Sequence, residues 1–353
     1  MSASIELSSV HGPRTIGRGG PCYVIAEMSA NHNHDIERAE RIVRAAAEAG
    51  ADAIKLQTYT ADTLTIPCDN EYFRIKGTLW EGRTLHDLYQ EAYTPWEWQP
   101  RLKALANDLG MDCFSTPFDA SAVDFLEEMG VPCHKVASFE NGDIPLLEKI
   151  ASTGKPVILS TGMATLADID EAVRTLRVNG SGGVALLKCT SAYPAPPEEA
   201  NLRTIPHMAE AFDCPAGLSD HTMGSAVAVA AVALGACIIE KHFTLSRADG
   251  GPDSEFSMEP YEFGQMVRDI RSAEVALGRV CYEQTPKQRA SAVFKRSLFA
   301  VADIKDGEPF TPDNVRSIRP GYGLHPRHLA MVLSRRAAAD IAKGTPLTFE
   351  LLK

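Results

Sequence analysis

Several features typical of membrane, secreted and nucleic-acid-binding proteins are missing from this sequence. No apolar run approaches the roughly 20 residues that a membrane-spanning helix needs. The first twenty residues lack a basic stretch followed by an apolar one, so we expect no secretion signal and a cytoplasmic protein. Positive charge is scarce as well: 35 Lys and Arg stand against 46 Asp and Glu. The net charge of −11 argues against a surface that coats nucleic acid, because phosphate backbones select basic faces.

The eight cysteines include no CxxC pair. A disulfide framework is unusual in a chain of 353 residues without a secretion signal, so we expect buried, reduced thiols. With 44% hydrophobic and 23% charged residues, the composition is that of a globular protein. The length suits one large domain followed by a small one.

Short apolar runs alternate with amphipathic stretches over most of the chain. There are eight such runs, at residues 22–26, 53–56, 111–114, 133–136, 156–159, 184–187, 215–218 and 236–239. Helical patterns, such as those at 36–49 and 121–129, lie between them. Alternating strands and helices indicate parallel βαβ units, and eight units over about 250 residues is the size of a closed barrel. We therefore predict an α/β protein with a (β/α)₈ TIM barrel at residues 1–278.

An open, doubly wound sheet is the alternative fold. It would gather ligand groups from a few strands at one switch point. Here almost every predicted strand ends in reactive side chains, which favours the barrel. Beyond the barrel, residues 279–295 are polar and basic without strand periodicity and are interpreted as a linker. Residues 296–353 hold short strand patterns between turn signals, which predicts a small β-rich domain with a marginal core that packs on the barrel or on a partner chain.

Two lysines lie inside apolar strand runs, Lys55 and Lys135. A buried ammonium is costly unless it meets an anion. Together with Ser and Thr hydroxyls from neighbouring strands, these lysines predict a pocket for a phosphate and a carboxylate. The alternative is that they point outward between barrel and helices, but their recurrence on several strands favours the anion site.

Two histidines, His221 and His242, end consecutive strands, which are neighbours in a barrel. Two imidazoles so placed can hold one divalent metal, although a single histidine is more often a structural residue. With oxygen or water completing the shell, Mn²⁺ or Mg²⁺ is favoured over structural Zn²⁺. Glu27 and Glu240 end the first and eighth strands, which meet when a barrel closes; they are candidates for proton transfer, or alternatively for ion pairs with the lysines.

Short motifs along nearly the whole chain resemble the sialic acid synthase family. They are found at residues 25–27, 31–33, 55–57, 115–118, 135–138, 159–163, 189–194, 217–222, 239–244, 251–253 and 319–321. No single motif is specific, but the set is. The resemblance implies a barrel with a C-terminal antifreeze-like (SAF) domain, in a domain-swapped homodimer whose caps reach across to the partner's site.

The resemblance also implies roles for individual residues. It implies that Glu27 and Glu240 are catalytic and that His221 and His242 hold the metal. The positions that surround phosphoenolpyruvate are Lys55, Thr116, Lys135, Ser138, Ser160 and Ser219. The positions at the amino-sugar site are Asn31, Tyr193, Asp253 and the cap residue Arg319, and Glu27 also matches one.

Only a few motifs indicate which branch of the family, and therefore which acceptor sugar, the sequence resembles. Residues 29–33 (SANHN), 76–82 (KGTLWEG) and 92–98 (AYTPWEW) look like pseudaminic acid synthases, whereas neuraminate synthases typically have Gly-Val in the first motif and lack the second. Ser191 departs from the Asn often found at its position. We expect the acceptor 2,4-diacetamido-2,4,6-trideoxy-L-altrose, whose methyl and acetamido groups suit Leu79 and Trp80. The alternatives are an N-acetylneuraminate or legionaminate synthase, a lyase, or a non-catalytic sugar-binding protein.

Overall fold

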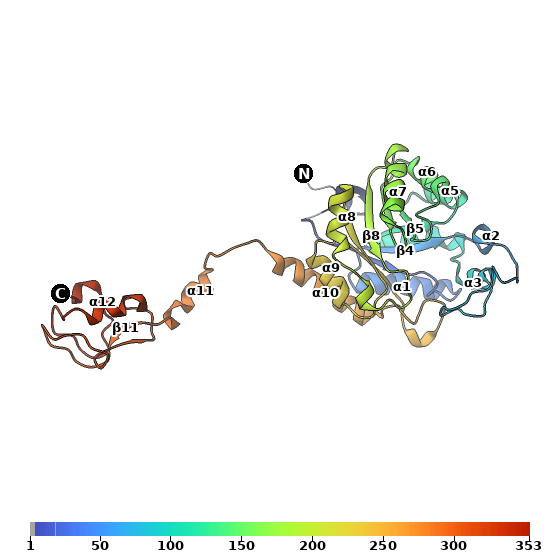
Figure 1. The fold of residues 1–353 in the computed structure, drawn as a ribbon. Helices are drawn as coiled ribbons and strands as arrows, with labels where there is room; N and C mark the ends of the chain where they lie inside the picture. The colour runs from blue at the N-terminus through green and yellow to red at the C-terminus, as the bar shows by residue number, and fades with distance from the viewer. Residues whose placement is uncertain (1–3, 18) are drawn as a thin grey trace. The chain divides into compact units, whose positions relative to one another are not determined.

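The computed structural model describes residues 4–17 and 19–353 and divides into two compact units, Met1–Gly278 and Arg279–Lys353. The first unit is built around a closed barrel of parallel strands, seen with its surrounding helices in Figure 1. The barrel strands are β3 (Tyr23–Glu27), β4 (Ala53–Thr58), β5 (Asp112–Pro117), β6 (His134–Val136), β7 (Val157–Ser160), β8 (Val184–Cys189), β9 (Ala216–Asp220) and β10 (Ile238–His242). They follow one another in chain order, and β10 pairs with β3 to close the ring. The predicted TIM barrel is confirmed, and the open sheet is excluded.

Helices of the barrel unit alternate with these strands. They are α1 (Ile36–Glu48), α2 (Ala61–Leu64), α3 (Leu85–Ala92), α4 (Gln99–Asp108), α5 (Ala120–Met129), α6 (Ile144–Ala151), α7 (Leu166–Val178), α8 (Thr204–Phe212), α9 (Ala226–Ala233) and α10 (Pro260–Leu277). Side-chain caps fix several starting points: Asp35 accepts a hydrogen bond from the backbone of α1, and Asp119 does the same for α5. Gly130, in the left-handed conformation, ends α5.

Side-chain alternation along the strands separates the two sides of the barrel wall. On β3, Val24 and Ala26 pack in the large cluster between strands and helices, together with Ile42 and Val43 of α1. Their neighbour Ile25 belongs instead to a second cluster inside the barrel. Successive strand residues face opposite sides. A strand therefore presents its odd- or even-numbered residues to the barrel axis, and its last inward residue reaches the carboxyl end of the barrel.

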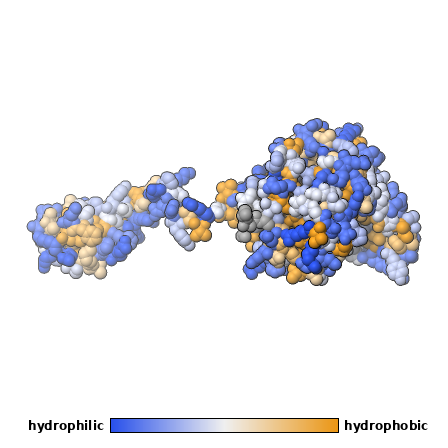
Figure 2. Space-filling model, turned by 90° about the horizontal axis from the view of Figure 1, so that it is seen from above, coloured by the Kyte–Doolittle hydropathy of each residue, from blue (hydrophilic) through white to orange (hydrophobic). Residues whose placement is uncertain are grey.

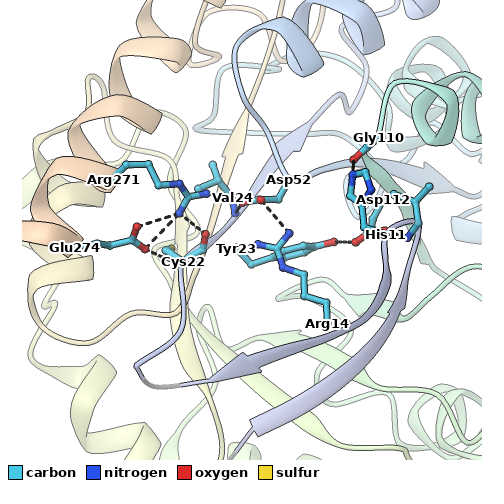
Figure 3. Close-up of polar contacts among 11 residues, drawn as sticks. His11, Arg14, Cys22, Tyr23, Val24, Asp52, Gly110, Asp112, Arg271 and Glu274 are labelled. Carbon is cyan, nitrogen blue, oxygen red and sulfur yellow. Dashed lines mark hydrogen bonds and ion pairs between the residues drawn. The ribbon is translucent and has the colours of Figure 1, made fainter.

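A hairpin that the sequence analysis did not predict, β1 (Ser4–Ser9) with β2 (Gly12–Gly17), packs on the second cluster through Ile5, Leu7 and Ile16. Figure 3 shows the polar contacts beside it. The Tyr23 hydroxyl donates to Asp112 at 2.7 Å, where β3 and β5 begin. Arg14 and Arg271 both pair with Asp52, at 2.9 and 2.8 Å. These contacts join the amino ends of the strands, the end of such barrels that serves stability.

The second unit has its own small core, formed by residues such as Leu298, Val315 and Val332. Its regular sheet is one antiparallel pair, β11 (Ser297–Ala300) with β12 (Val315–Ile318), supplemented by isolated bridges and the short helix α12 (Leu329–Leu333). The segment interpreted as a linker contains α11 (Pro286–Ala290). On the face in Figure 2, hydrophobic residues lie scattered among hydrophilic ones. Within residues 4–17 and 19–353, no helix is both long and apolar enough to cross a membrane.

Candidate active site

A cavity of about 370 Å³ lies at the carboxyl ends of the barrel strands. Inward-facing residues from most strands line it: Glu27, Lys55, Lys135, Ser160, Cys189, Ser219, Glu240 and His242. The alternation described above explains this set, because each residue continues the inward row of its strand, as Glu27 continues Tyr23 and Ile25. The cavity therefore occupies the end of the barrel at which this fold carries its active sites.

Two lysines and two glutamates form a buried charged cluster at the floor of the cavity. Lys55 Nζ lies 2.7 Å from Glu27 Oε2 and 3.7 Å from Glu240 Oε1. Lys135 Nζ lies 3.9 Å from the same Glu240 oxygen. All four side chains are buried. Both lysines therefore face the cavity, and the outward orientation considered for them is excluded.

Hydroxyl groups surround these ammonium groups. Lys135 Nζ donates to Ser160 Oγ at 2.7 Å, and Lys55 Nζ donates to Thr116 Oγ1 at 3.2 Å. Ser219 Oγ donates to Glu240 at 3.3 Å. Ser138 lines the cavity and is 2.9 Å from Ser191 Oγ. Two cations with several small donors can bind an anion that carries more than one negative group.

The pKa values of the two glutamates are shifted in opposite directions. Burial raises the pKa of Glu27 to about 7; Lys55 opposes this rise and Glu240 adds to it. Burial would also raise the pKa of Glu240, but the neighbouring charges of Lys135 and Lys55 bring it below its ordinary value. Glu27 is thus suited to exchange a proton near neutral pH, while Glu240 is an anion before substrate binds.

The two histidines lie at one side of the cavity, with ring centroids 5.3 Å apart. His221 Nδ1 is 2.9 Å from the Thr190 carbonyl oxygen, which orients the ring and leaves Nε2 for a ligand. His242 Nδ1 is buried and has no hydrogen-bond partner within residues 4–17 and 19–353. Burial keeps the pKa of His242 well below its ordinary value, in the neutral form that binds metals.

These features fit a metal ion held by two imidazoles. No group of three or more His, Cys, Asp or Glu side chains placed to hold a metal occurs in the described part of the chain. Such an ion would take its remaining ligands from water or substrate oxygen, as oxygen-preferring divalent ions commonly do.

The residues predicted for sugar binding are placed differently from one another. Tyr193 and Asp253 line the cavity, and the ring centroids of Tyr193 and His221 are 4.5 Å apart. Asn31 lies behind the wall, where its amide donates to the Phe243 carbonyl at 3.0 Å and to Ser257 Oγ at 2.9 Å. Arg319 belongs to the second unit and follows β12 directly.

An apolar wall was missed in the sequence analysis. It faces the cavity from α2, α3, the carboxyl ends of β4 and β5 and the segment before α3, and consists of Tyr59, Leu64, Ile75, Leu85, Leu88, Tyr89, Ala92 and Phe118. Trp80 joins it, and its indole N–H donates to the Pro252 carbonyl at 2.9 Å. Leu79, which we expected to contact substrate, is 46% exposed. Glu140, which follows β6, also lines the cavity.

Comparison with known proteins identifies the family. Residues 42–282 match the model of the NeuB family, and residues 295–353 match the SAF domain. The chain belongs to the NeuB family. It is 42% identical to a pseudaminic acid synthase of Helicobacter pylori, over 93% of this chain and 97% of that protein. It is 44% identical to a pseudaminic acid synthase of Campylobacter jejuni strain 81-176, over 92% and 95% of the two chains.

A solved NeuB-family structure agrees with the fold. The crystal structure of N-acetylneuraminic acid synthetase from Leptospira borgpetersenii superposes with a TM-score of 0.71 at 33% identity, covering 82% of this chain and 95% of that one. The resemblance to the sialic acid synthase family and its pseudaminic acid synthase branch is thus confirmed, and so is the C-terminal SAF domain. The chain is an enzyme of this family.

Proposed function

We propose that this enzyme condenses phosphoenolpyruvate with 2,4-diacetamido-2,4,6-trideoxy-L-altrose and water, giving pseudaminic acid and phosphate. The observation that carries the proposal is the buried cluster of Lys55, Lys135, Glu27 and Glu240 beside a histidine pair. The identity of 42–44% to two pseudaminic acid synthases supports the choice of acceptor.

The lysine cluster supplies the binding site for phosphoenolpyruvate. Its phosphate and carboxylate bring several negative charges, which Lys55 and Lys135 can balance, with Ser138, Ser160 and Ser219 as further donors. Thr116 does not line the cavity itself; it accepts a hydrogen bond from Lys55 and so helps to orient the ammonium group. Holding the enol carbon against the acceptor aldehyde is the main contribution of this end of the cavity.

Proton transfer falls to the glutamates. The enol carbon of phosphoenolpyruvate bonds to the aldehyde carbon, whose oxygen takes a proton; we assign this donation to Glu27, whose pKa of about 7 leaves it partly protonated near neutral pH. Water then adds to the cationic carbon, which still carries the phosphate ester oxygen, and we assign the proton that this water loses to the Glu240 carboxylate. The carbon–oxygen bond to phosphate breaks last. The new hydroxyl on that carbon returns a proton to Glu27 and becomes the ketone, and phosphate leaves with the bridging oxygen and takes up the proton held by Glu240.

His221 and His242 are the proposed metal ligands, with Mn²⁺ or Mg²⁺ as the expected ions. A bound divalent ion would supply Lewis-acid polarisation of the acceptor aldehyde oxygen. Replacing His242 by Gln should reduce the Mn²⁺ bound by the purified enzyme, because one of two protein ligands is lost. Electron paramagnetic resonance of added Mn²⁺ measures this directly. His207, on α8, provides the control as His207→Gln; Mn²⁺ binding that survives His242→Gln unchanged would contradict the assignment.

The apolar wall faces the acceptor in this proposal. A 6-deoxy sugar with two acetamido groups presents three methyl groups, and aromatic and aliphatic side chains bind methyl groups better than hydroxyls. Tyr193 and Asp253 then provide the polar contacts.

The homodimer is part of the same proposal. The C-terminal unit carries 13 Lys and Arg against seven Asp and Glu, whereas the barrel unit carries 22 against 39. A basic domain that brings Arg319 to the partner's cavity would be attracted electrostatically both by the acidic barrel unit and by the anionic substrate. Sedimentation of the full-length enzyme as a monomer would contradict this part of the proposal.

Phosphate release tests the reaction. With Mn²⁺ and phosphoenolpyruvate present, 2,4-diacetamido-2,4,6-trideoxy-L-altrose should support fast release and yield a nine-carbon product by mass spectrometry. N-acetylmannosamine is the comparison substrate, because the chain is also 33% identical to an N-acetylneuraminic acid synthetase. Release with N-acetylmannosamine alone would favour neuraminate synthesis. No release with either sugar, in metal-loaded enzyme, would favour a sugar-binding protein.

Glu140 predicts a pH dependence. Burial raises its pKa to about 7, with Lys135 opposing and Asp143 adding to the rise. As pH rises through 7, Glu140 loses its proton. Its carboxylate then adds to the negative charge of Glu240 in the cavity, and both repel the anionic substrate. We expect kcat/KM for phosphoenolpyruvate to fall above pH 7 and this fall to weaken in Glu140→Gln. Steady-state kinetics from pH 6 to 9 measures both profiles, with Glu148→Gln, on α6, as the control. Superimposable profiles for Glu140→Gln and the unmodified enzyme would exclude this role.

A further inference from the structure

Ser29 adopts a backbone conformation that is costly for its residue type. It follows β3 closely, and its φ of 45° lies in the left-handed region, where a side chain other than that of glycine is strained. It is also buried, at 1% exposure. Glycine would adopt this conformation without strain. A strained serine in a cavity wall therefore requires an interaction that glycine cannot make.

That interaction is with Asp253. The Ser29 hydroxyl donates a hydrogen bond to Asp253 Oδ2, and the Ala30 backbone N–H donates to the same oxygen at 3.3 Å. Both Ser29 and Asp253 line the cavity. No hydrogen bond to the second oxygen, Oδ1, is formed within the described residues, 4–17 and 19–353. One carboxylate oxygen is thus fixed by the segment after β3, while the other stays available as an acceptor.

The turn that carries Asp253 is held on its other sides too. Ser257 Oγ donates to the Asp253 carbonyl at 2.6 Å, and Trp80 donates to the carbonyl of Pro252 at 2.9 Å. At Gly251 a Cβ would come within 2.3 Å of Asn33 Oδ1, so the turn approaches the segment after β3 closely. The backbone of the turn is fixed without Ser29. What the Ser29 hydroxyl adds is the orientation of the Asp253 carboxylate.

We propose that Ser29 is a positioning residue for acceptor recognition: it orients the Asp253 carboxylate so that Oδ1 accepts a hydrogen bond from a hydroxyl or acetamido N–H of the amino sugar. This inference rests on the proposed function for the identity of the sugar. It explains why strain is retained at this position. Because phosphoenolpyruvate is an anion that binds at the lysine cluster, an oriented carboxylate at Asp253 is suited to the neutral acceptor instead.

Two substitutions separate orientation from strain. Ser29→Gly removes the hydroxyl and relieves the backbone, whereas Ser29→Ala removes the hydroxyl and keeps the strain. We expect both to raise the KM for the acceptor about tenfold, the loss of roughly one hydrogen bond, with the KM for phosphoenolpyruvate changed less than about twofold. Ser29→Gly should unfold at the same or a higher temperature than the unmodified enzyme, and Ser29→Ala at a lower one than Ser29→Gly. In an Asp253→Asn background, Ser29→Gly should change the acceptor KM less than about twofold.

The outcomes are separable from those of the proposed function. An acceptor KM that stays within about twofold in both Ser29 variants overturns the positioning role, and so does an equal rise in the KM of both substrates. If the unmodified enzyme turns over neither sugar, the proposed function fails, and the crystal structure of Ser29→Gly still decides the inference. An Asp253 carboxylate that keeps its orientation in that structure overturns it; a carboxylate that rotates or becomes disordered supports it.

Discussion

Replacing Lys135 by methionine should nearly abolish phosphate release from phosphoenolpyruvate while the barrel stays folded. Lys135 is buried, donates to Ser160 at 2.7 Å and lies 3.9 Å from Glu240. Methionine fills a similar volume without the charge. Removing one partner of a buried charged contact costs about 2–5 kcal/mol, and at about 1.4 kcal/mol per decade this is a loss of roughly 30- to 4,000-fold in kcat/KM.

The chain offers a matched control for this substitution. Lys188 is also a lysine within a barrel strand, but it continues the outward row of Val184 and Leu186 on β8, and its Nζ donates to the Cys189 carbonyl at 2.9 Å. Lys188→Met should leave kcat/KM within about threefold, less than about 1 kcal/mol, because Lys188 is not among the residues that line the cavity. If Lys135→Met retains that level of activity as well, the lysine cluster is not the anion site.

Integrity of the barrel can be followed in the same samples. All three tryptophans, Trp80, Trp96 and Trp98, lie in the barrel unit. Intrinsic tryptophan fluorescence in urea therefore reports the unfolding of that unit without interference from the SAF domain. A Lys135→Met enzyme with an unchanged urea midpoint and lost turnover has lost binding or chemistry and not its fold.

The barrel and most of its site residues follow from the sequence because strand periodicity and strand ends determine both. Each of the eight predicted runs became a barrel strand, and inward alternation brings Glu27, Lys55, Lys135 and Glu240 together. Strand ends converge in a closed barrel, so residues far apart in sequence could be placed in one site without knowledge of the loops.

The unpredicted features have weak local signals. On β1, Ile5 and Leu7 alternate with polar residues, but two apolar residues are too short a pattern to identify a strand, and it is their packing on the barrel interior that places the hairpin. Ser29 and Asn33, on either side of Asn31, adopt left-handed backbone conformations, and the Asn31 amide donates to the Phe243 carbonyl instead of lining the cavity.

The apolar wall was missed for a related reason. On α3, Leu85, Leu88 and Ala92 form a helical stripe of the kind that normally packs in a core. These residues line a cavity here only because α3 lies beside the carboxyl ends of the barrel strands.

The second large effect is expected from a buried ion pair on the outer side of the barrel wall. Lys241 Nζ lies 2.6 Å from Asp220 Oδ2, and both side chains are 1% exposed. The same Nζ donates to the Thr222 carbonyl at 2.5 Å, and Asp220 Oδ1 accepts from the Thr222 backbone N–H at 2.9 Å. The pair thus joins β10 to the turn after β9 that carries His221.

Lys241→Met should lower the free energy of unfolding of the barrel by about 3–5 kcal/mol, because it leaves the Asp220 carboxylate buried without its counter-charge. Urea titration followed by tryptophan fluorescence measures the change. Arg174→Met is the matched control: its pair with Asp170 is an exposed i,i+4 pair on α7, and such pairs contribute about 0.3–0.5 kcal/mol.

A double substitution distinguishes an uncompensated charge from lost packing. In Asp220→Asn/Lys241→Met both charges are gone, and the amide oxygen of the substituted side chain can still accept from Thr222. If the buried charge causes the loss, the double variant should be more stable than Lys241→Met alone. If packing of the lysine stem causes it, the double variant should be no more stable than the single one. Because the pair holds the turn that carries His221, we also expect Lys241→Met to bind Mn²⁺ less tightly; a double variant that regains stability but still binds Mn²⁺ weakly would indicate that the ion pair itself fixes this turn.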